Sequence, residues 1–474
     1  MSPNTVFPLY ERPRNDITER IIEHPRVSHH VQDDVLVLAI KDELLVHSSV
    51  RSNAPQFHDE LSRVAELRGS LGADPRPGQP DILEDIERWS LKDAGEHSVD
   101  QARRLRQFAR DRRIKLGSGA AAHLPAVTPN HVCTVMPFDF CPATPPHAVP
   151  PPPQAQVRGF IEPIRRGAPR AEVVVIDTGY ISADPPHARL DARVRSIPGQ
   201  WFDTLADQPA WIDSAPDEAD ADGDGKLDGV AGHGTFVAGI VAHGCRQCRI
   251  TVVGQRHESM SVTRHPVDRA RLFSTEYEIA RSLLVHSDAH VILCGFAFPT
   301  LDRHPSIAFT SAMEAIRAQA APRRDVAVVA PAGNEASAQP YWPAAHPDVI
   351  GVAASNRRGN GRAWFSNWGS WLDCCTRGES VFSTFIDWSG QMDGAPPTDI
   401  EHFQGWATWS GTSFSAPKVA AAIADVYVAQ GGRVSPLSAF RQLISGAAGV
   451  AVEPLTDPTL PGAYGVALPY LALG

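Results

Sequence analysis

The sequence predicts an α/β protein with a doubly wound, mostly parallel sheet and a smaller N-terminal α+β domain. Two observations lead to this prediction. Beyond residue 170, five apolar segments rich in β-branched residues alternate with segments of helical character. Before them lies the proline-dense stretch PATPPHAVPPPP (142–153). Because proline-rich segments are extended and semi-rigid, this stretch predicts a boundary that separates residues 1–150 from residues 151–474.

The five apolar segments are predicted to be strands buried on both faces of the sheet. They read VVVID (173–177), RITVVG (249–254), HVILCGF (290–296), VAVVAPAG (326–333) and VIGVAAS (349–355). Helices are predicted at 235–244, 275–287 and 306–320. Strands that alternate with helices indicate parallel pairing, and such sheets carry their sites at the carboxyl ends of the strands.

The N-terminal region predicts a smaller set of elements. The segments VLVLAI (36–41) and LLVHSS (44–49) predict a hairpin. Apolar spacing and good helix formers predict helices at 56–67 and 99–113. We recognise no motif in this region that identifies a function.

Composition argues against several classes of partner. The net charge of −10 disfavours nucleic acid and anionic membranes as partners, because both favour a basic protein face. No apolar run reaches the length of a membrane span, and the first twenty residues lack the apolar core of a signal peptide. Seven cysteines are an odd number and do not suggest a disulfide scaffold. We therefore expect a cytoplasmic protein with reduced thiols, while unconventional export stays open.

The cysteines occur partly in close pairs. These are Cys245 with Cys248, Cys374 with Cys375, and Cys133 with Cys141. A zinc site needs four ligands, and nothing in the sequence brings two pairs together. A local disulfide or buried thiols are favoured for the first two pairs, and the third pair could form a disulfide in an oxidising compartment.

Four polar residues stand at the ends of predicted elements, and each also has an ordinary structural interpretation. Asp177 ends a strand and Asn334 follows one, as turn residues often do. His233 lies between two glycines at the start of a helix, and Ser413 begins another helix, where serine is a preferred cap. Their shared position at element ends favours a common site at one edge of the sheet.

The four residue types together suit nucleophilic catalysis. A serine hydroxyl is a weak nucleophile at neutral pH and needs an imidazole to accept its proton. A carboxylate fixes the tautomer of that imidazole and stabilises the imidazolium. An asparagine amide can donate to an oxyanion, as can the unpaired N–H groups at a helix start. The sequence thus supplies an orienting residue, a base, a nucleophile and an oxyanion donor.

The segments VVVIDTG, GHGTFVAGIVA, APAGN and GTSFSAP resemble the four signature segments of the subtilisin-like (subtilase) serine peptidases. The resemblance covers roughly residues 160–450 and keeps the family's Asp, His, Ser order. It implies a subtilisin-like fold in which Asp177 orients His233, His233 is the general base and acid, Ser413 attacks, and Asn334 helps to form the oxyanion hole.

The resemblance also selects one serine among three. Ser413 follows Gly411 and Thr412, where the family keeps its nucleophile. Ser410 is expected to be structural, and Ser415 is expected to be a capping or packing hydroxyl.

One segment departs from the family pattern. The family strand that lines the substrate pocket reads V-I-N-M-S-L-G, whereas this chain has VILCGFA at 291–297. We expect Gly295, Phe296 and Ala297 to contact substrate. Because Gly295 and Ala297 replace a serine and a glycine, no substrate preference can be carried over.

An acidic loop, DADGDGKLD (220–228), precedes the histidine segment. Its aspartates match the first nine positions of a calcium-binding loop, with Gly225 in sixth place: Asp220, Asp222, Asp224 and Asp228. The twelfth position is Ala231 in place of the usual glutamate. A solvated acidic loop and a calcium site both remain as interpretations, and the chemistry itself requires no cofactor.

The resemblance implies a serine endopeptidase that hydrolyses protein or peptide substrates through an acyl-enzyme. Residues 1–150 are expected to restrain it, either as an inhibitory pro-segment that is later removed or as a retained regulatory domain. Two alternatives stay open: a catalytically silent subtilase fold that binds a partner, and a peptide ligase or acyl transferase with the same triad.

Overall fold

The computed structural model describes most of the chain. Its described residues are 21–32, 35–70, 86–93, 97–114, 127–134, 145–152, 167, 169–181, 190, 194–197, 219–220, 223–255, 274–319, 325–393, 398–455 and 468–473. Within these ranges, no helix has both the length and the apolar character needed to cross a lipid bilayer.

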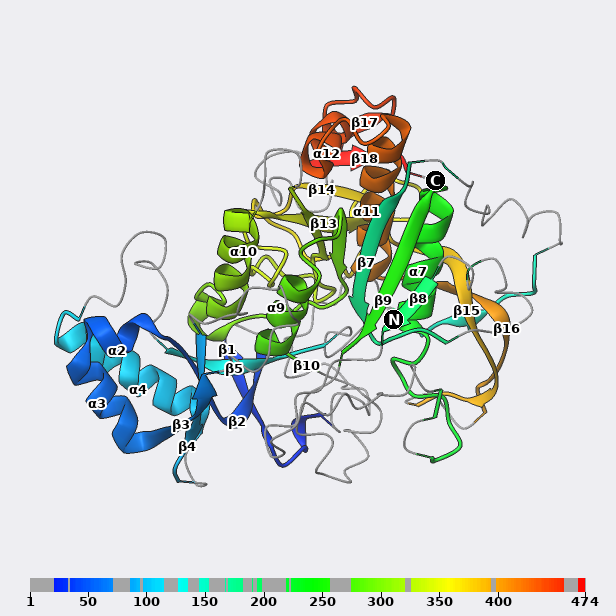
Figure 1. Ribbon diagram of the computed structural model, residues 1–474. Helices are drawn as coiled ribbons and strands as arrows, with labels where there is room; N and C mark the ends of the chain where they lie inside the picture. The colour runs from blue at the N-terminus through cyan, green and yellow to red at the C-terminus, as the bar shows by residue number, and fades with distance from the viewer. Residues whose placement is uncertain are drawn as a thin grey trace.

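A nine-stranded sheet forms the centre of the larger part of the molecule (Figure 1). Its strand order is β17-β18-β14-β13-β12-β11-β7-β9-β8. The strands are β7 (Ala171–Asp177), β8 (Val194–Ile197), β9 (Cys248–Gly254), β11 (Val291–Cys294), β12 (Ala327–Pro331), β13 (Val349–Ser355), β14 (Cys374–Arg377), β17 (Val452–Leu455) and β18 (Leu468–Leu471). Every neighbouring pair is parallel except β17 with β18. The predicted mostly parallel sheet is therefore confirmed.

Helices cover both faces of this sheet, because alternate residues of a strand point to opposite sides. Val174 and Ile176 belong to the apolar cluster formed with α9 (Glu276–Val285) and α10 (Ile307–Gln319). Val173 and Val175 belong to the cluster formed with α7 (His233–Gly244) and α11 (Thr412–Ala429). The helix α12 (Pro436–Ile444) packs with this second cluster. Figure 1 shows the two sets of helices on opposite sides of the strands.

Small residues bring α7 and α11 close together. A Cβ added to Gly244 would lie 2.7 Å from the Cβ of Ala421. Pro417 is the sixth residue of α11 and lies inside the helix, so the carbonyl of Ser413 receives no intrahelical N–H from it. The sequence therefore favours a tightly packed helix pair whose first residues include His233 and Ser413.

The N-terminal part is an antiparallel sheet with helices on one side, which confirms the predicted α+β character. Its strand order is β10-β5-β2-β4-β3, and β1 pairs with β2. The elements are β1 (Val27–Gln32), β2 (Val35–His47), α2 (Ser49–Asn53), α3 (Pro55–Val64), β3 (Ala65–Ser70), β4 (Ile86–Leu91), α4 (Ser98–Asp111), β5 (Val127–Cys133) and β10 (Ser274–Thr275). The strand β10 comes from the larger part of the chain, so the two parts share this sheet.

The predicted hairpin at 36–49 is wrong, because β2 is one long strand through Val35–His47. The polar residues Lys41 and Asp42 favoured a turn in the sequence. In the structure, Arg26 forms ion pairs with Asp42 at 3.0 Å and with Glu43 at 3.1 Å. These partners let the strand continue through its polar centre, where its pairing with β5 shifts register.

A third, smaller sheet has the order β15-β16-β6. It consists of β15 (Val381–Gln391), β16 (Ile400–Trp409) and the short β6 (His147–Ala148). The strand β6 lies within the proline-dense stretch and pairs with β16. This stretch is therefore anchored on the larger part of the molecule.

Candidate active site

Asp177 and His233 form a buried hydrogen-bonded pair. Asp177 is the last residue of β7, and His233 is the first residue of α7. The Nδ1 of His233 lies 2.7 Å from Oδ1 of Asp177, and neither side chain is exposed to solvent. In this arrangement Nδ1 carries the proton and Nε2 is the basic nitrogen.

Backbone contacts hold the carboxylate of Asp177 in place. Its Oδ1 also accepts a hydrogen bond from the N–H of Thr178 at 2.8 Å. Its Oδ2 faces Gly295, where an added Cβ would lie only 2.1 Å away. The carboxylate is therefore confined on one side by hydrogen bonds and on the other by the backbone of Gly295.

The glycines around His233 permit a very close approach of two loops. A Cβ on Gly234 would lie 2.1 Å from the carbonyl oxygen of Gly179. The N–H of Gly234 donates to Oγ1 of Thr178 at 3.0 Å. Gly232 has a φ of 76°, a left-handed conformation that favours glycine. The sequence Gly-His-Gly thus serves to seat His233 against the end of β7.

Aromatic rings surround the imidazole of His233. The ring of Trp409 lies 5.5 Å away in an edge-on arrangement, and the ring of Phe414 lies 5.4 Å away. The Nε2 atom is buried and has no hydrogen-bond partner within the described part of the chain. The basic nitrogen is therefore shielded from solvent, and the hydroxyl of Ser413 does not hydrogen-bond to it in this structure.

Ser413 lies in the first turn of α11 and is buried. The neighbouring Phe414 contacts the ring of His233, so the start of α11 lies against the start of α7. The first N–H groups of any α-helix lack acceptors within the helix and can bind an anion. Ser415 is buried inside the helix and donates to the carbonyl of Thr412 at 2.8 Å, so its hydroxyl bonds to the preceding turn and does not cap the helix.

Asn334 is tied to the same turn of α11. Its Oδ1 accepts hydrogen bonds from the N–H and from Oγ1 of Thr412, each at 2.8 Å. These two bonds fix the plane of the amide and occupy its oxygen. The opposite side of the amide carries its nitrogen. This nitrogen is the group of Asn334 that can donate a hydrogen bond to an oxyanion.

Asn367 is a buried residue that the sequence did not single out. Its Oδ1 accepts from the N–H groups of Glu335 at 3.0 Å and Ser337 at 2.9 Å. Its Nδ2 donates to the carbonyl of Ala332 at 2.9 Å and to the carboxylate of Glu335 at 3.0 Å. Asn367 therefore holds the loop that carries Asn334. The sequence did not predict this role, because Asn367 is separated from Asn334 along the chain and no motif surrounds it.

The segment Gly295–Ala297 lies close to Asp177 but is covered. Phe296 and Ala297 are buried. The N–H of Ala297 donates to the carbonyl of Thr134, which directly follows β5, at 3.3 Å. The two residues form an antiparallel bridge. The segment expected to contact substrate is thus paired with the N-terminal part of the chain.

Hydrogen bonds to its aspartates hold the described part of the acidic loop. Both carboxylate oxygens of Asp220 accept backbone N–H groups, from Gly223 and Asp224 and from Gly225. Asp224 accepts from the N–H and Nζ of Lys226. The described residues contain no group of three or more His, Cys, Asp or Glu that could hold a metal ion. Of the four predicted ligands, Asp222 lies outside the described residues.

Six cysteines in the described ranges are buried, reduced thiols: Cys133, Cys245, Cys248, Cys294, Cys374 and Cys375. Cys248 donates its thiol to the carbonyl of Cys245 at 3.3 Å. Burial raises the pKa of Cys294, the last residue of β11 near Asp177, to about 12. These thiols are therefore inert packing groups at neutral pH. Cys141, the seventh cysteine, lies outside the described residues.

The family model of the subtilase family matches residues 170–466. The chain belongs to the subtilase family. The match spans every strand of the nine-stranded sheet except β18, and it includes Asp177, His233, Asn334 and Ser413. It leaves out the N-terminal part.

Several known proteins are similar to this subtilase. A thermophilic serine proteinase of Bacillus sp. (strain AK1) is 27% identical over 285 residues, which cover 59% of this chain and 57% of the relative. Thermitase of Thermoactinomyces vulgaris is 32% identical over 112 residues, covering 24% of this chain and 34% of thermitase. This subtilase therefore matches little more than half the length of the first relative.

A solved structure supports the fold over nearly the whole chain. Fervidolysin from Fervidobacterium pennivorans, described as a keratinolytic enzyme related to subtilisin, aligns with a TM-score of 0.53 and 16% identity. The alignment covers 94% of this chain and 61% of fervidolysin. At this identity the likeness concerns the fold alone.

Proposed function

We propose that this subtilase is a serine endopeptidase that hydrolyses peptide bonds through an acyl-enzyme. The observation that carries the proposal is the buried 2.7 Å hydrogen bond between Asp177 and His233, with Ser413 in the first turn of the adjacent helix. A serine beside an oriented imidazole has the arrangement that makes a hydroxyl nucleophilic.

The first half of the reaction forms the acyl-enzyme. Ser413 Oγ attacks the carbonyl carbon of the peptide bond while its proton passes to Nε2 of His233. Asp177 stays ionised and stabilises the imidazolium through the Nδ1 hydrogen bond. The amide nitrogen of Asn334 and the N–H groups at the start of α11 donate to the oxyanion. His233 then gives its proton to the leaving amine as the C–N bond breaks.

The second half returns the enzyme to its starting state. A water molecule attacks the ester carbonyl and passes a proton to His233, and the second tetrahedral intermediate uses the same donors. Collapse releases the acid product, and Ser413 recovers its proton. The rings of Trp409 and Phe414 flank the buried imidazole, and this low-dielectric setting strengthens its interaction with Asp177.

We also propose that the N-terminal part of the chain restrains the enzyme. One supporting contact joins β5 to α9: Nδ1 of His131 lies 2.5 Å from Oε1 of Glu276. The Nε2 of His131 accepts a hydrogen bond from the N–H of Leu301 at 3.0 Å. The Nδ1 of His131 therefore carries the proton and donates to Glu276. Ser306 also donates to Glu276. These groups are buried, so the contact is specific and well shielded from water.

A second supporting contact joins α4 to the 3-10 turn Leu301–Arg303. Asp302 pairs with Arg103 at 2.7 Å and with Arg106 at 3.1 Å. The third is the bridge between Thr134 and Ala297. A peptide substrate that pairs with Gly295–Ala297 would have to displace the chain around Thr134, so this arrangement favours inhibition while the N-terminal part stays bound.

Two experiments test the proposal. Ser413→Ala should lower kcat for casein or a peptide by on the order of 10⁶, as the equivalent change does in subtilisin. A fluorophosphonate probe should label Ser413 in the parent protein and not in His233→Ala. Casein hydrolysis that survives Ser413→Ala would exclude the proposed nucleophile, and mass spectrometry of the products separates hydrolysis from ligation.

The N-terminus of the purified protein tests the restraint. If residues up to about 150 are an inhibitory pro-segment, the active protein loses them and Ser413→Ala keeps them. If both proteins keep their first residues and the parent is active, the N-terminal part is a retained domain. Full activity of the intact parent, unchanged after proteolytic removal of this part, would contradict any restraint.

A further inference from the structure

A cavity of about 270 Å³ lies between the end of α7, the helix that begins at His233, and the middle of α11, the helix that carries Ser413. Its walls come from α7, α11, β14, β15 and the segment after β18. The described lining residues are Ile240, His243, Gly244, Arg377, Val381, Phe382, Lys418, Ala422 and Leu473. They include three nitrogen-bearing basic side chains and no acidic one.

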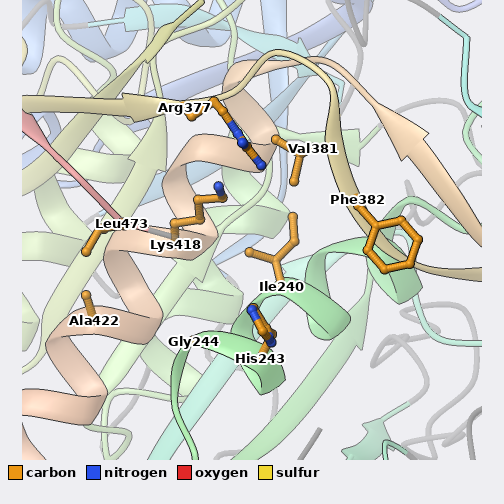
Figure 2. A pocket seen from close by; sticks show the side chains of 9 residues that line it. All are labelled: Ile240, His243, Gly244, Arg377, Val381, Phe382, Lys418, Ala422 and Leu473. Carbon is orange, nitrogen blue, oxygen red and sulfur yellow. The ribbon is translucent and has the colours of Figure 1, made fainter. Parts of the chain in front are cut away.

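Lys418 extends into this cavity from α11 and is almost fully buried, with 7% of its surface exposed. Its Nζ has no hydrogen-bond partner within the described part of the chain. Arg377, the last residue of β14, extends toward the same space (Figure 2), and its Nε is also buried without a described partner. A buried, uncompensated cation is costly, and here the half-buried Arg377 adds a second positive charge to the same cavity.

Among the described lining residues, no carboxylate compensates these charges. Burial, together with the positive charge of Arg377, lowers the pKa of Lys418 to about 8. Asp425 lies two helical turns beyond Lys418 on α11 and does not line the cavity. A lysine and an arginine arranged in this way form a site that a carboxylate or phosphate would complete.

The remaining walls are apolar. Ile240, Val381, Phe382, Ala422 and Leu473 surround the space beside the two cations. The cavity has a volume of about 270 Å³. It can therefore hold an anion with a short hydrocarbon chain, whose tail would contact these walls.

We propose that this cavity is a binding site for a small organic anion, a carboxylate with a short apolar tail, held by Lys418 and Arg377. The site is separate from the reacting atoms. Lys418 lies five residues after Ser413 and His243 lies ten residues after His233, or about 7.5 and 15 Å along their helices. A ligand there would bridge α7 and α11 and hold the two helices together.

Calorimetry on the full chain carrying Ser413→Ala tests the site without self-cleavage. Sodium hexanoate, sodium acetate and sodium phosphate are titrated at constant ionic strength, and thermal unfolding is recorded in parallel. We expect saturable binding, tightest for hexanoate, with a matching rise in Tm. Because the reporter protein has no nucleophile, the result is independent of the proposed peptidase activity.

Lys418→Met removes the charge and keeps an unbranched side chain, and it should weaken hexanoate binding by about tenfold or more. Arg433→Met is the matched control, since it makes the same charge change at an exposed residue, and it should bind hexanoate as the parent does. If Lys418→Met does not fold, Arg377→Gln at the half-buried partner should give the same loss.

Three results would overturn the proposal. The first is no saturable binding of any of the three anions. The second is equal hexanoate binding by the parent, Lys418→Met and Arg377→Gln. The third is phosphate binding tighter than hexanoate binding, which would exclude an organic carboxylate as the preferred class.

Discussion

Gly295 leaves the space that the carboxylate of Asp177 occupies. A Cβ at position 295 would lie 2.1 Å from Oδ2 of Asp177 and 3.1 Å from the carbonyl oxygen of Ile176. The first of these distances is far shorter than any stable contact, so either the carboxylate or the strand must move. The pairing of Asp177 with His233 therefore depends on the absence of a side chain at Gly295, which directly follows the neighbouring strand β11.

Gly295→Ala should accordingly lower kcat. Movement of Asp177 would break its 2.7 Å hydrogen bond to His233, and loss of this orientation in a triad costs up to about 10⁴ in kcat. We expect a loss of about 10²-fold, because some of the strain can be relieved by small shifts. Steady-state hydrolysis of a peptide substrate measures the effect.

Gly361→Ala is the control for this substitution. Gly361 is buried, but its added Cβ would meet only the side-chain nitrogen of Asn356, at 3.1 Å, and the hydrogen bond of that nitrogen to Asn360 is exposed. It should leave kcat within about twofold of the parent, because none of the proposed catalytic residues takes part in this contact. A Gly295→Ala protein as active as Gly361→Ala would show that Asp177 does not need this space.

Asn367→Ala should destabilise the loop that carries Asn334. The substitution removes an amide that makes hydrogen bonds to Ala332, Glu335 and Ser337 in a buried setting. Leaving such groups unsatisfied costs about 1–3 kcal/mol each, so we expect a loss of about 2–4 kcal/mol in the free energy of unfolding. Urea denaturation measures this loss, and kcat should fall with it.

The exposed Asn360 offers a matched comparison. Its Oδ1 accepts one hydrogen bond from Asn356 at the surface, where water can replace it. Asn360→Ala should therefore change the free energy of unfolding by less than about 0.5 kcal/mol. Equal effects of the two substitutions would argue that Asn367 does not organise the loop.

Chelation of metal ions should leave peptide hydrolysis unchanged. Every proton and charge in the proposed reaction is handled by Asp177, His233, Ser413 and the oxyanion donors. The acidic loop at 220–228 supplies none of these groups. Activity in excess EDTA should equal activity in added calcium chloride. A loss of activity in EDTA that added calcium chloride restores would contradict this expectation.

The sequence predicted the main sheet well because its strands are buried on both faces and read as continuous apolar runs. It also placed Asp177 and His233 at element ends, which parallel topology brings to one edge. It could not reveal Asn367, since a buried amide that serves a distant loop leaves no periodic pattern. Nor could it reveal the single strand β2, where ion pairs from Arg26 replace the turn that Lys41 and Asp42 suggested.

Asp302→Asn should weaken the restraint by the N-terminal part. Arg106 is buried and would lose its carboxylate partner, which costs about 1–3 kcal/mol and corresponds to roughly tenfold or more in the binding equilibrium. The intact, unprocessed protein should therefore hydrolyse a short peptide several-fold faster than the parent. An unchanged rate would indicate that the contact at Asp302 does not limit access to the site.

The same contact should fail in acid. Burial by itself raises the pKa of Asp302, but the hydrogen bond and charge of Arg103, together with Arg106, bring it below the usual value. A carboxylate whose pKa is lower in the folded protein adds stability above its unfolded pKa of about 3.9 and loses that contribution as the pH falls through the folded value.

In the Ser413→Ala background, the Tm difference that Asp302→Asn produces should stay constant from about pH 5 to 7 and shrink below about pH 4. Asp399→Asn, at an exposed carboxylate, should show little difference at any pH. A Tm difference at Asp302 that persists unchanged into strong acid would mean that its ionisation does not support the contact with α4.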